Sequence, residues 1–236
     1  MHPYRNRWLT VLLCRLIAVS LWTQTTYGSH FISRVFFDRA TGIATSLETS
    51  DIPTHSNLSA WLKNEKSSSI ARKIFQEYPS WLCQGGITLG LLKAESYSYG
   101  RNKHRVRVHD RLFGINVITF GQPTSSSLQL KHQKNNSCSA TTKVELPIVG
   151  GCLVSRPTDT DTCSGCLQFI LQTSSVGVAR LETGIAGDYF PALVGQPPVL
   201  PIRAWVYQST QSMVHSYIMW RFHQHCYHQE GELKIN

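Results

Sequence analysis

The chain has 236 residues, of which 42% are hydrophobic and 16% charged, and its formal net charge at pH 7 is +9. This composition suits a globular domain with a sizeable core and excludes wholesale disorder. The positive charge permits anionic partners or membrane surfaces. The chain lacks the motifs GxSxG, HExxH, GxxxxGKS/T and GxGxxG, which lowers support for hydrolase, zinc-protease and nucleotide-cofactor functions. We expect no cofactor and no nucleic acid partner.

The first 28 residues have the pattern of a secretory signal peptide. Arg5 and Arg7 precede an apolar run from Trp8 to Trp22, and small residues follow it. The run is too short to span a bilayer comfortably, and Arg15 interrupts it. We therefore predict a cleaved signal and a protein that is secreted or lumenal in the secretory pathway. An uncleaved anchor is one alternative. The other is a bipartite plastid presequence that continues into residues 31–46.

Six cysteines remain after the predicted signal, and an even number in an oxidising compartment predicts up to three disulfides. The candidates are Cys83, Cys138, Cys152, Cys163, Cys166 and Cys226. The CxxC at 163–166 fits a structural bridge, half of a metal site or a redox pair. We predict no metal site, because no second CxxC exists and helical spacing separates the histidines of 223–228. Asn57 and Asn135 begin N-glycosylation triplets, which predicts a glycoprotein.

Residues 29–56 show no sustained period, so we predict a linker or loosely docked arm. From Asn57 to Tyr78 apolar residues recur at helical spacing, and Pro79 is expected to end this helix. Candidate strands follow over 87–93, 105–120, 127–132, 141–147, 152–156, 167–173 and 178–186. Their hairpin-length gaps predict an antiparallel sheet.

The last expected element is a long helix. From Arg203 to Tyr227 there is no Gly or Pro, and Pro201 suits a first helical turn. Two nearly opposite faces of this helix are apolar, one formed by Val206, Met213, Tyr217 and Trp220 and the other by His215, Met219, Phe222 and Cys226. A helix that is apolar on two sides is usually buried between layers, so we expect it to rest on the sheet.

This order of one helix, six or seven antiparallel strands and a long C-terminal helix resembles the helix-grip arrangement of START-like and polyketide-cyclase-like proteins. The resemblance covers residues 57–228 as a single domain, followed by a tail over 229–236, and it rests on element order. It implies an α+β fold whose sheet curls around the C-terminal helix and encloses a ligand cavity. An NTF2-like cone and a lipocalin-like barrel are competing architectures, which the long terminal helix favours less.

The second apolar face of the helix holds the first candidate site. His215 is flanked there by Met219 and Phe222, and in a cavity it would act as acid or base near neutral pH. Glu182 and Asp188, on or just after the last strand, are the catalytic carboxylates expected to approach it. The residues expected to contact an apolar ligand are Met219, Phe222, Arg180 and Tyr189. The alternative for His215 is a core histidine without a catalytic role.

The second candidate site is the segment of residues 101–111, in which every odd position carries a basic residue or histidine. Residues of one parity share one face of a strand, so Val106 and Val108 would face the core. The basic residues of the opposite face are Arg101, Lys103, Arg105, Arg107 and Arg111. This basic ridge would bind phosphate, a sulfated sugar or anionic lipid. The alternative is the solvated face of an edge strand.

Three functions are therefore open. The first is a module that binds an apolar small molecule or lipid between the sheet and the C-terminal helix. The second is a cyclase, isomerase or dehydratase that uses His215 and a carboxylate in the same cavity. The third is a secreted interaction or effector protein that binds anionic partners through the basic ridge. The sequence does not decide whether the chain is an enzyme, and it makes no prediction of the oligomeric state.

Overall fold

The computed structural model describes residues 31–53, 67–84, 88, 90–98, 104–132, 137–154, 165–173, 178–195 and 197–228. Predictions for the first 28 residues, for the tail, and for Asn57, Arg101, Lys103, Asn135 and Cys163 fall outside these ranges, as does the side chain of Cys138. No helix within the described ranges is long and apolar enough to cross a membrane.

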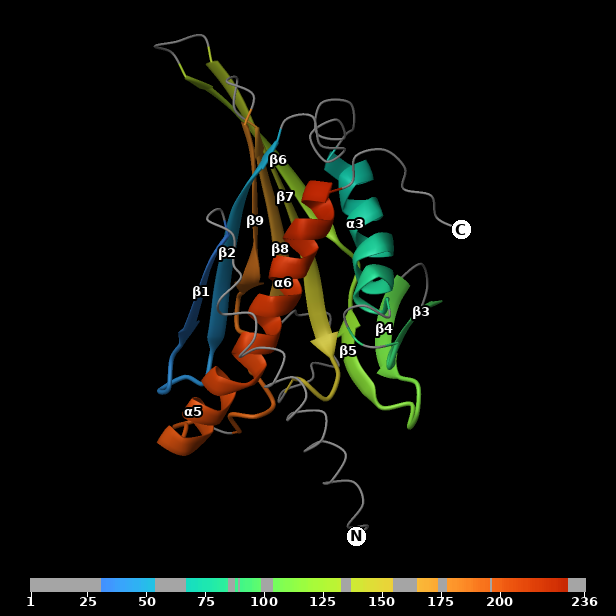
Figure 1. Ribbon diagram of the computed structural model, residues 1–236, viewed down its shortest axis with the longest axis vertical. Helices are drawn as coiled ribbons and strands as arrows, with labels where there is room; N and C mark the ends of the chain where they lie inside the picture. The colour runs from blue at the N-terminus through green and yellow to red at the C-terminus, as the bar shows by residue number, and fades with distance from the viewer. Residues whose placement is uncertain are drawn as a thin grey trace.

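The described residues form nine strands of one antiparallel sheet (Figure 1). Its main path runs β1, β2, β9, β8, β7, β5, β4, β3, and β6 pairs with β7 off this path. The strands are β1 Phe31–Phe37, β2 Ala44–Pro53, β3 Leu92–Ser98, β4 His104–Asp110, β5 Asn116–Phe120, β6 Thr124–His132, β7 Ser137–Gly150, β8 Cys166–Thr173 and β9 Val178–Ala186.

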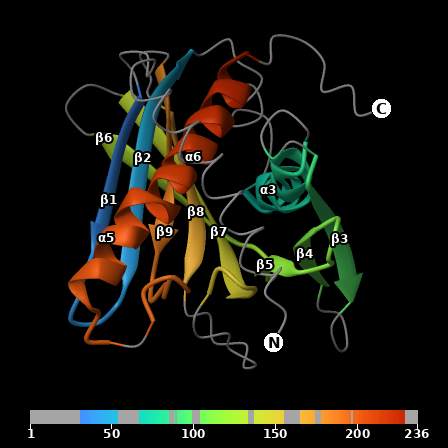
Figure 2. The ribbon, with the colours of Figure 1, turned by 60° about the horizontal axis from the view of Figure 1, so that its bottom comes forward.

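Three helices, α3 Ser67–Leu82, α5 Pro201–Ser209 and α6 Gln211–His228, lie on one side of this sheet (Figures 1 and 2). The helix α6 crosses the inner face of β1 and β2, and α3 covers β6, β7 and β3. This is the predicted α+β fold, an antiparallel sheet that curves around a long C-terminal helix.

The prediction of a linker over residues 29–56 is wrong for Phe31–Pro53. These residues form β1 and β2, and β2 joins them to the main sheet by pairing with β9. The inward-facing residues of β2 are Ala44, Ser46 and Glu48, and all three are buried. Because two of them are polar, the alternation of buried and exposed positions is not an alternation of apolar and polar residues, and the strand signal is hidden.

The helix boundaries differ from the prediction in two places. The helix α3 continues through Pro79 to Leu82, because the proline lies in the last turn and removes only one hydrogen-bond donor. The predicted long helix begins at Pro201 as expected but is divided at Thr210. The hydroxyl of Thr210 donates to the carbonyl of Val206 at 2.5 Å, which is the acceptor that an uninterrupted helix would give to its N–H. The N–H of Thr210 bonds Tyr207 instead.

Three strand predictions also needed correction. The predicted strand over 105–120 is two strands, β4 and β5, which are joined by a tight turn over 111–115. The expected strand over 87–93 is displaced to β3, which begins at Leu92. Residues 152–154 form a turn and one isolated bridge, from Val154 to Pro191, rather than the predicted strand.

The core lies between the sheet and the two longer helices. Its centre is a group of aromatic rings, Tyr78 and Trp81 from α3, Phe169 from β8 and Phe222 from α6. Tyr78 meets Phe169 at 5.3 Å and Phe222 at 5.2 Å between ring centroids, both edge to face, which is a favourable aromatic geometry. Met219 is also buried here, so the face of α6 that carries Met219 and Phe222 is the one that packs inward.

Candidate functional site

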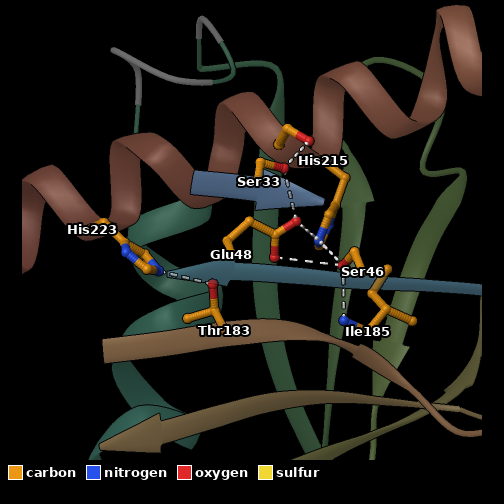
Figure 3. Close-up of polar contacts among 8 residues, drawn as sticks. Ser33, Ser46, Glu48, Thr183, Ile185, His215 and His223 are labelled. Atoms are coloured by element: carbon orange, nitrogen blue, oxygen red, sulfur yellow. Dashed lines mark hydrogen bonds and ion pairs between the residues drawn. The ribbon is translucent and has the colours of Figure 1, made fainter. Parts of the chain in front are cut away.

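A carboxylate and a histidine meet between β2 and α6 (Figure 3). Glu48 is fully buried on the inner face of β2, and its Oε1 lies 3.5 Å from Nε2 of His215 on α6. The hydroxyl of Ser33 on β1 donates to Oε1 of Glu48 at 3.4 Å, and that of Ser46 donates to Oε2 at 3.5 Å. Three elements therefore direct polar side chains at one buried carboxylate.

The side-chain contacts of Glu48 are long for a buried carboxylate. Hydrogen bonds to a carboxylate are usually about 2.5–2.9 Å, and a buried charge is costly unless it is well paired. Glu48 therefore retains the capacity to accept a shorter hydrogen bond from another donor. Burial and then the charge of Glu48 raise the pKa values of Tyr78 and Tyr207, so both phenols stay protonated around it.

Ser46 has a supporting role at this site. Its hydroxyl oxygen accepts the backbone N–H of Ile185 at 2.9 Å and lies 2.9 Å from Nε2 of His215. Ser46 and Glu48 approach the same ring nitrogen of His215, whereas in a Ser-His-acid triad the acid binds the other nitrogen. This geometry does not fit nucleophilic serine chemistry, and it leaves His215 and Glu48 as a pair that can exchange a proton.

A second histidine, His223, holds α6 against the sheet. Its Nδ1 lies 2.6 Å from the Ser50 hydroxyl on β2, and its Nε2 lies 2.9 Å from the Thr183 hydroxyl on β9. The ring of Phe31 meets it edge to face at 5.2 Å. Burial lowers the pKa of His223 to about 3, so the ring is neutral at physiological pH, with one nitrogen donating and the other accepting.

The carboxylate beside His215 is Glu48 rather than the predicted Glu182 or Asp188. Glu182 and Thr183 are neighbours on β9, and Thr183 faces α6, so Glu182 lies on the opposite face. There its Oε1 lies 3.4 Å from Nε of Arg180. Asp188 is exposed in the loop after β9. The structure therefore does not bring either predicted carboxylate to the helix.

The other predicted ligand contacts are divided between three places. Met219 and Phe222 lie in the core beneath α6. Arg180 is on the outer face of the sheet with Glu182. Tyr189 is buried near the start of α6, where its hydroxyl donates to the carbonyl of Leu153 at 3.1 Å and accepts from Gln211 at 2.9 Å. Only Met219 and Phe222 of this set share the inner face of α6 with His215.

Glu48 was missed because its segment lacks an apolar alternation. Ser46, Glu48 and Ser50 occupy alternate positions, and each contacts a histidine of α6. A period of two among polar residues was the available signal, and it has the form of a strand whose buried side carries chemistry.

The basic ridge exists in part within the described residues. Val106 and Val108 are buried, as predicted, and Arg107 lies over the ring of Tyr97 at 4.8 Å. The strand β4 lies between β3 and β5, so it is not an edge strand. On β3, Glu95 pairs with Lys93 at 2.6 Å, and this pairing lowers its pKa. A carboxylate thus sits among the ridge's cations, and anion binding there stays a prediction.

The described cysteines give the disulfide prediction no support. Within the described ranges, Cys83, Cys152 and Cys226 form no disulfide. Burial raises the pKa of Cys83 to about 11 and that of Cys226 to about 12, which makes both thiols unreactive in the folded protein. No group of three or more His, Cys, Asp or Glu side chains that could hold a metal ion occurs in the described part of the chain.

Comparison with known proteins adds a weak likeness. No family model matches the chain, and no curated protein matches it. Among solved structures, the chain is similar to a STAR-related lipid transfer protein (fragment 25–204) from Xanthomonas axonopodis, with 8% sequence identity and a TM-score of 0.33. The match covers 82% of this chain and 96% of that one. A likeness at this level carries no argument about function, so the site must be interpreted from its own geometry.

Proposed function

We propose that the protein binds an apolar small molecule or a lipid between the inner face of the sheet and α6, and that the ligand's polar group donates a hydrogen bond to Glu48. The observation that carries the proposal is Glu48 itself, a fully buried carboxylate whose contacts with Ser33, Ser46 and His215 are all 3.4 Å or longer. A ligand hydroxyl or amine would give this carboxylate the short hydrogen bond that the described side chains do not supply.

The surroundings of Glu48 fit an amphipathic ligand. Aromatic and thioether side chains, among them Phe222 and Met219, lie on the inner face of α6 and would contact an apolar body. The side chain of His215, in contrast, is partly exposed and lies beside Glu48, so this part of the helix face is polar. The division of one helix face into an apolar part and a polar part is what recognition of a molecule with one polar end requires.

The experiment is native mass spectrometry of the purified full chain, followed by denaturing conditions. We expect a co-purifying mass that is lost on denaturation. In Glu48→Gln the retained fraction should fall about tenfold, because a hydrogen bond to a charged acceptor becomes one to a neutral acceptor. Glu182→Gln is the matched control, since Glu182 lies on the outer face of the same sheet, and it should retain the ligand fully.

A melting temperature for each variant separates loss of binding from loss of folding. The proposal is rejected if the wild-type chain carries no adduct from its native source. It is also rejected if the Glu48 and Glu182 variants retain the ligand equally.

The pair of Glu48 and His215 favours a second candidate function, that of a cyclase, isomerase or dehydratase. A carboxylate 3.5 Å from an imidazole can act with it in acid–base chemistry on a bound molecule. His215→Asn tests this function. An enzyme would accumulate a substrate that differs from the wild-type adduct in mass or chromatographic retention, whereas a binding protein would hold the same molecule in both forms.

We also propose that the protein enters the secretory pathway, with plastid delivery as the alternative. The support is the basic start, short apolar run and small residues of the first 28 positions. Binding of anionic partners through the basic ridge is a further proposal, supported by the exposed Arg107 of β4.

A further inference from the structure

Two turns and the start of α5 lie at the same end of the sheet. The β1–β2 turn and the start of α5 are in contact there, because the N–H of Val199 donates to the carbonyl of Arg39 at 2.9 Å. The antiparallel register places the end of β9 beside the start of β8, with Ala186 opposite Cys166. It places the start of β8 beside the last part of β7, with Cys166 opposite Pro147. The segment after β7 lies beside the start of β5, where the carbonyl of Asn116 accepts the N–H of Cys152. The β4–β5 turn directly precedes Asn116, so it lies at this end as well (Figures 1 and 2).

The β4–β5 turn presents apolar side chains to solvent. Leu112, Phe113 and Ile115 are all exposed, and Phe113 is 62% exposed. Surface positions with several large apolar side chains together mark interaction sites more often than scattered ones do.

The backbone N–H groups of this turn need no water. The carboxylate of Asp110 accepts the N–H groups of Leu112 at 3.0 Å, Phe113 at 2.6 Å and Ile115 at 2.6 Å. The N–H of Gly114 donates to the carbonyl of Asp110 at 3.2 Å, and that of Arg111 donates to the carbonyl of Leu91 at 2.8 Å. Every N–H from residue 111 to 115 is therefore bonded within the protein. A turn with this property can enter an apolar medium without leaving donors unsatisfied.

The helix α5 presents a second apolar group at the same end. Ile202 and Trp205 are three residues apart and both are 62% exposed, and Leu200 precedes them. Ala204 and Tyr207 form the opposite, buried face of this short helix. The exposed Trp205 indicates a membrane interface in particular, because tryptophan prefers the boundary between hydrocarbon and lipid headgroups.

The charges beside the two apolar groups favour a membrane as the occupant. Arg111 adjoins Leu112, and Arg203 lies between Ile202 and Trp205. No carboxylate occurs in residues 111–115 or 199–209. Two exposed acids share this end, Asp38 in the β1–β2 turn and Asp188 after β9, and both lie outside the two apolar groups. An arginine can lay its stem along apolar surface while its head contacts anionic lipid.

We propose that this end of the molecule is a membrane-docking surface, in which the tips Leu112–Phe113–Ile115 and Leu200–Ile202–Trp205 insert into the interfacial region of a bilayer that contains anionic lipid. Two separate apolar tips at one end suit a flat, fluid surface better than a groove on a protein partner, which would require one continuous patch. The inference does not depend on the proposed ligand.

The test is flotation of the full chain with vesicles of phosphatidylcholine, with and without phosphatidylserine. We expect binding to the mixed vesicles that weakens as salt rises. The double variant Phe113→Ser with Trp205→Ser should bind at least about tenfold more weakly, because two inserted aromatic side chains are lost. The matched control is Ile32→Ser with Leu47→Ser, which removes two exposed apolar residues from the outer face of β1 and β2 and should bind like the wild type.

A second measurement reports on the tip alone, whatever the N-terminal segment contributes to binding. The emission that wild type has and Trp205→Phe lacks belongs to Trp205, and lipids brominated along their acyl chains should quench it. Equal binding by the two double variants overturns the proposal. So does an absence of quenching of the Trp205 emission in the vesicle-bound wild type.

Discussion

His223 is the residue that ties the candidate site to the stability of the fold. Its ring joins α6 to Ser50 of β2 and Thr183 of β9. Ser50 lies two residues from Glu48 on the same strand, and Thr183 is the residue that pairs with Glu48 across the sheet. The two bonds fix the height of α6 over the sheet two turns away from His215. Because the ring is buried and neutral, protonating it in the folded protein would place a charge in the core, which is costly.

We expect His223 to make the protein less stable in acid. Its pKa is lowered to about 3 by burial, against 6.5 for an ordinary histidine, so between these values the unfolded chain holds a proton that the folded chain refuses. Acidification through this window therefore favours unfolding, by up to about 1.4 kcal/mol per pH unit from this one group. Urea unfolding at a series of pH values measures the slope.

The comparison variant is His223→Gln, which keeps a hydrogen-bonding side chain but cannot titrate. Its free energy of unfolding should be lower at neutral pH and should fall less steeply between pH 6.5 and 3. Identical slopes in the two proteins would show that His223 takes up its proton in the folded state as well.

The strands β2 and β9 approach each other closely at Gly184. A Cβ placed there would lie directly on the carbonyl of Ser46, so this position requires glycine for space. We expect Gly184→Ala to lower the free energy of unfolding by about 3 kcal/mol, because the strands must separate or the backbone must shift. Urea unfolding measures the loss.

Gly90→Ala is the control for that loss. Its Cβ would meet nothing within 4 Å, but its φ of +69° carries the cost of a left-handed conformation, about 1 kcal/mol. A Gly184 variant as stable as the Gly90 variant would mean that β2 tolerates displacement. In that case the close packing of β2 against β9 would not fix the position of Glu48.

The order of elements was predictable where punctuation and period agree. The strands β8 and β9 and the helical region after Pro201 have apolar patterns bounded by Gly, Pro or Ser, and the structure confirms all three. The division at Thr210 was not predictable from the spacing of apolar residues. It results from a side-chain hydrogen bond to the carbonyl of Val206 in the same helix, and such a bond does not alter that spacing.

The candidate site was predictable on the helix and not on the sheet. His215 and Phe222 follow from the stripes of α6, whose inner face packs as expected. The partner Glu48 was not found, because burial of a carboxylate opposes the rule that charged residues lie outside. A polar residue on a buried face breaks the local pattern, and such breaks are expected at functional positions.

The helical segment after Pro201 connects the two proposed sites. The exposed Trp205 lies on α5 at the docking end, and His215 lies on α6 above Glu48. The break at Thr210 stands between them, where the N–H of Thr210 bonds Tyr207 rather than continuing the helix. The two proposals can be tested separately, because the Phe113, Trp205 and Glu48 substitutions lie on different elements.

Another prediction concerns the residue at which the proposed signal is cleaved. We expect cleavage before Phe31, because β1 begins there and pairs with β2 along its whole length. Loss of residues from β1 would also remove Ser33, which donates to Glu48. Intact mass measurement of protein from its native source identifies the first residue, and a mass that includes Met1 would contradict delivery through a cleaved signal.

The same sample reports the state of two thiols. Burial holds the pKa of Cys83 near 11 and that of Cys226 near 12, so iodoacetamide should alkylate neither at neutral pH while the protein is folded. Denaturation without reductant should then expose both, and peptide mapping should find Cys83 and Cys226 alkylated. If their alkylation requires a reductant, each thiol has a disulfide partner in the native compartment, and the oxidising environment that the N-terminal pattern predicts is directly supported.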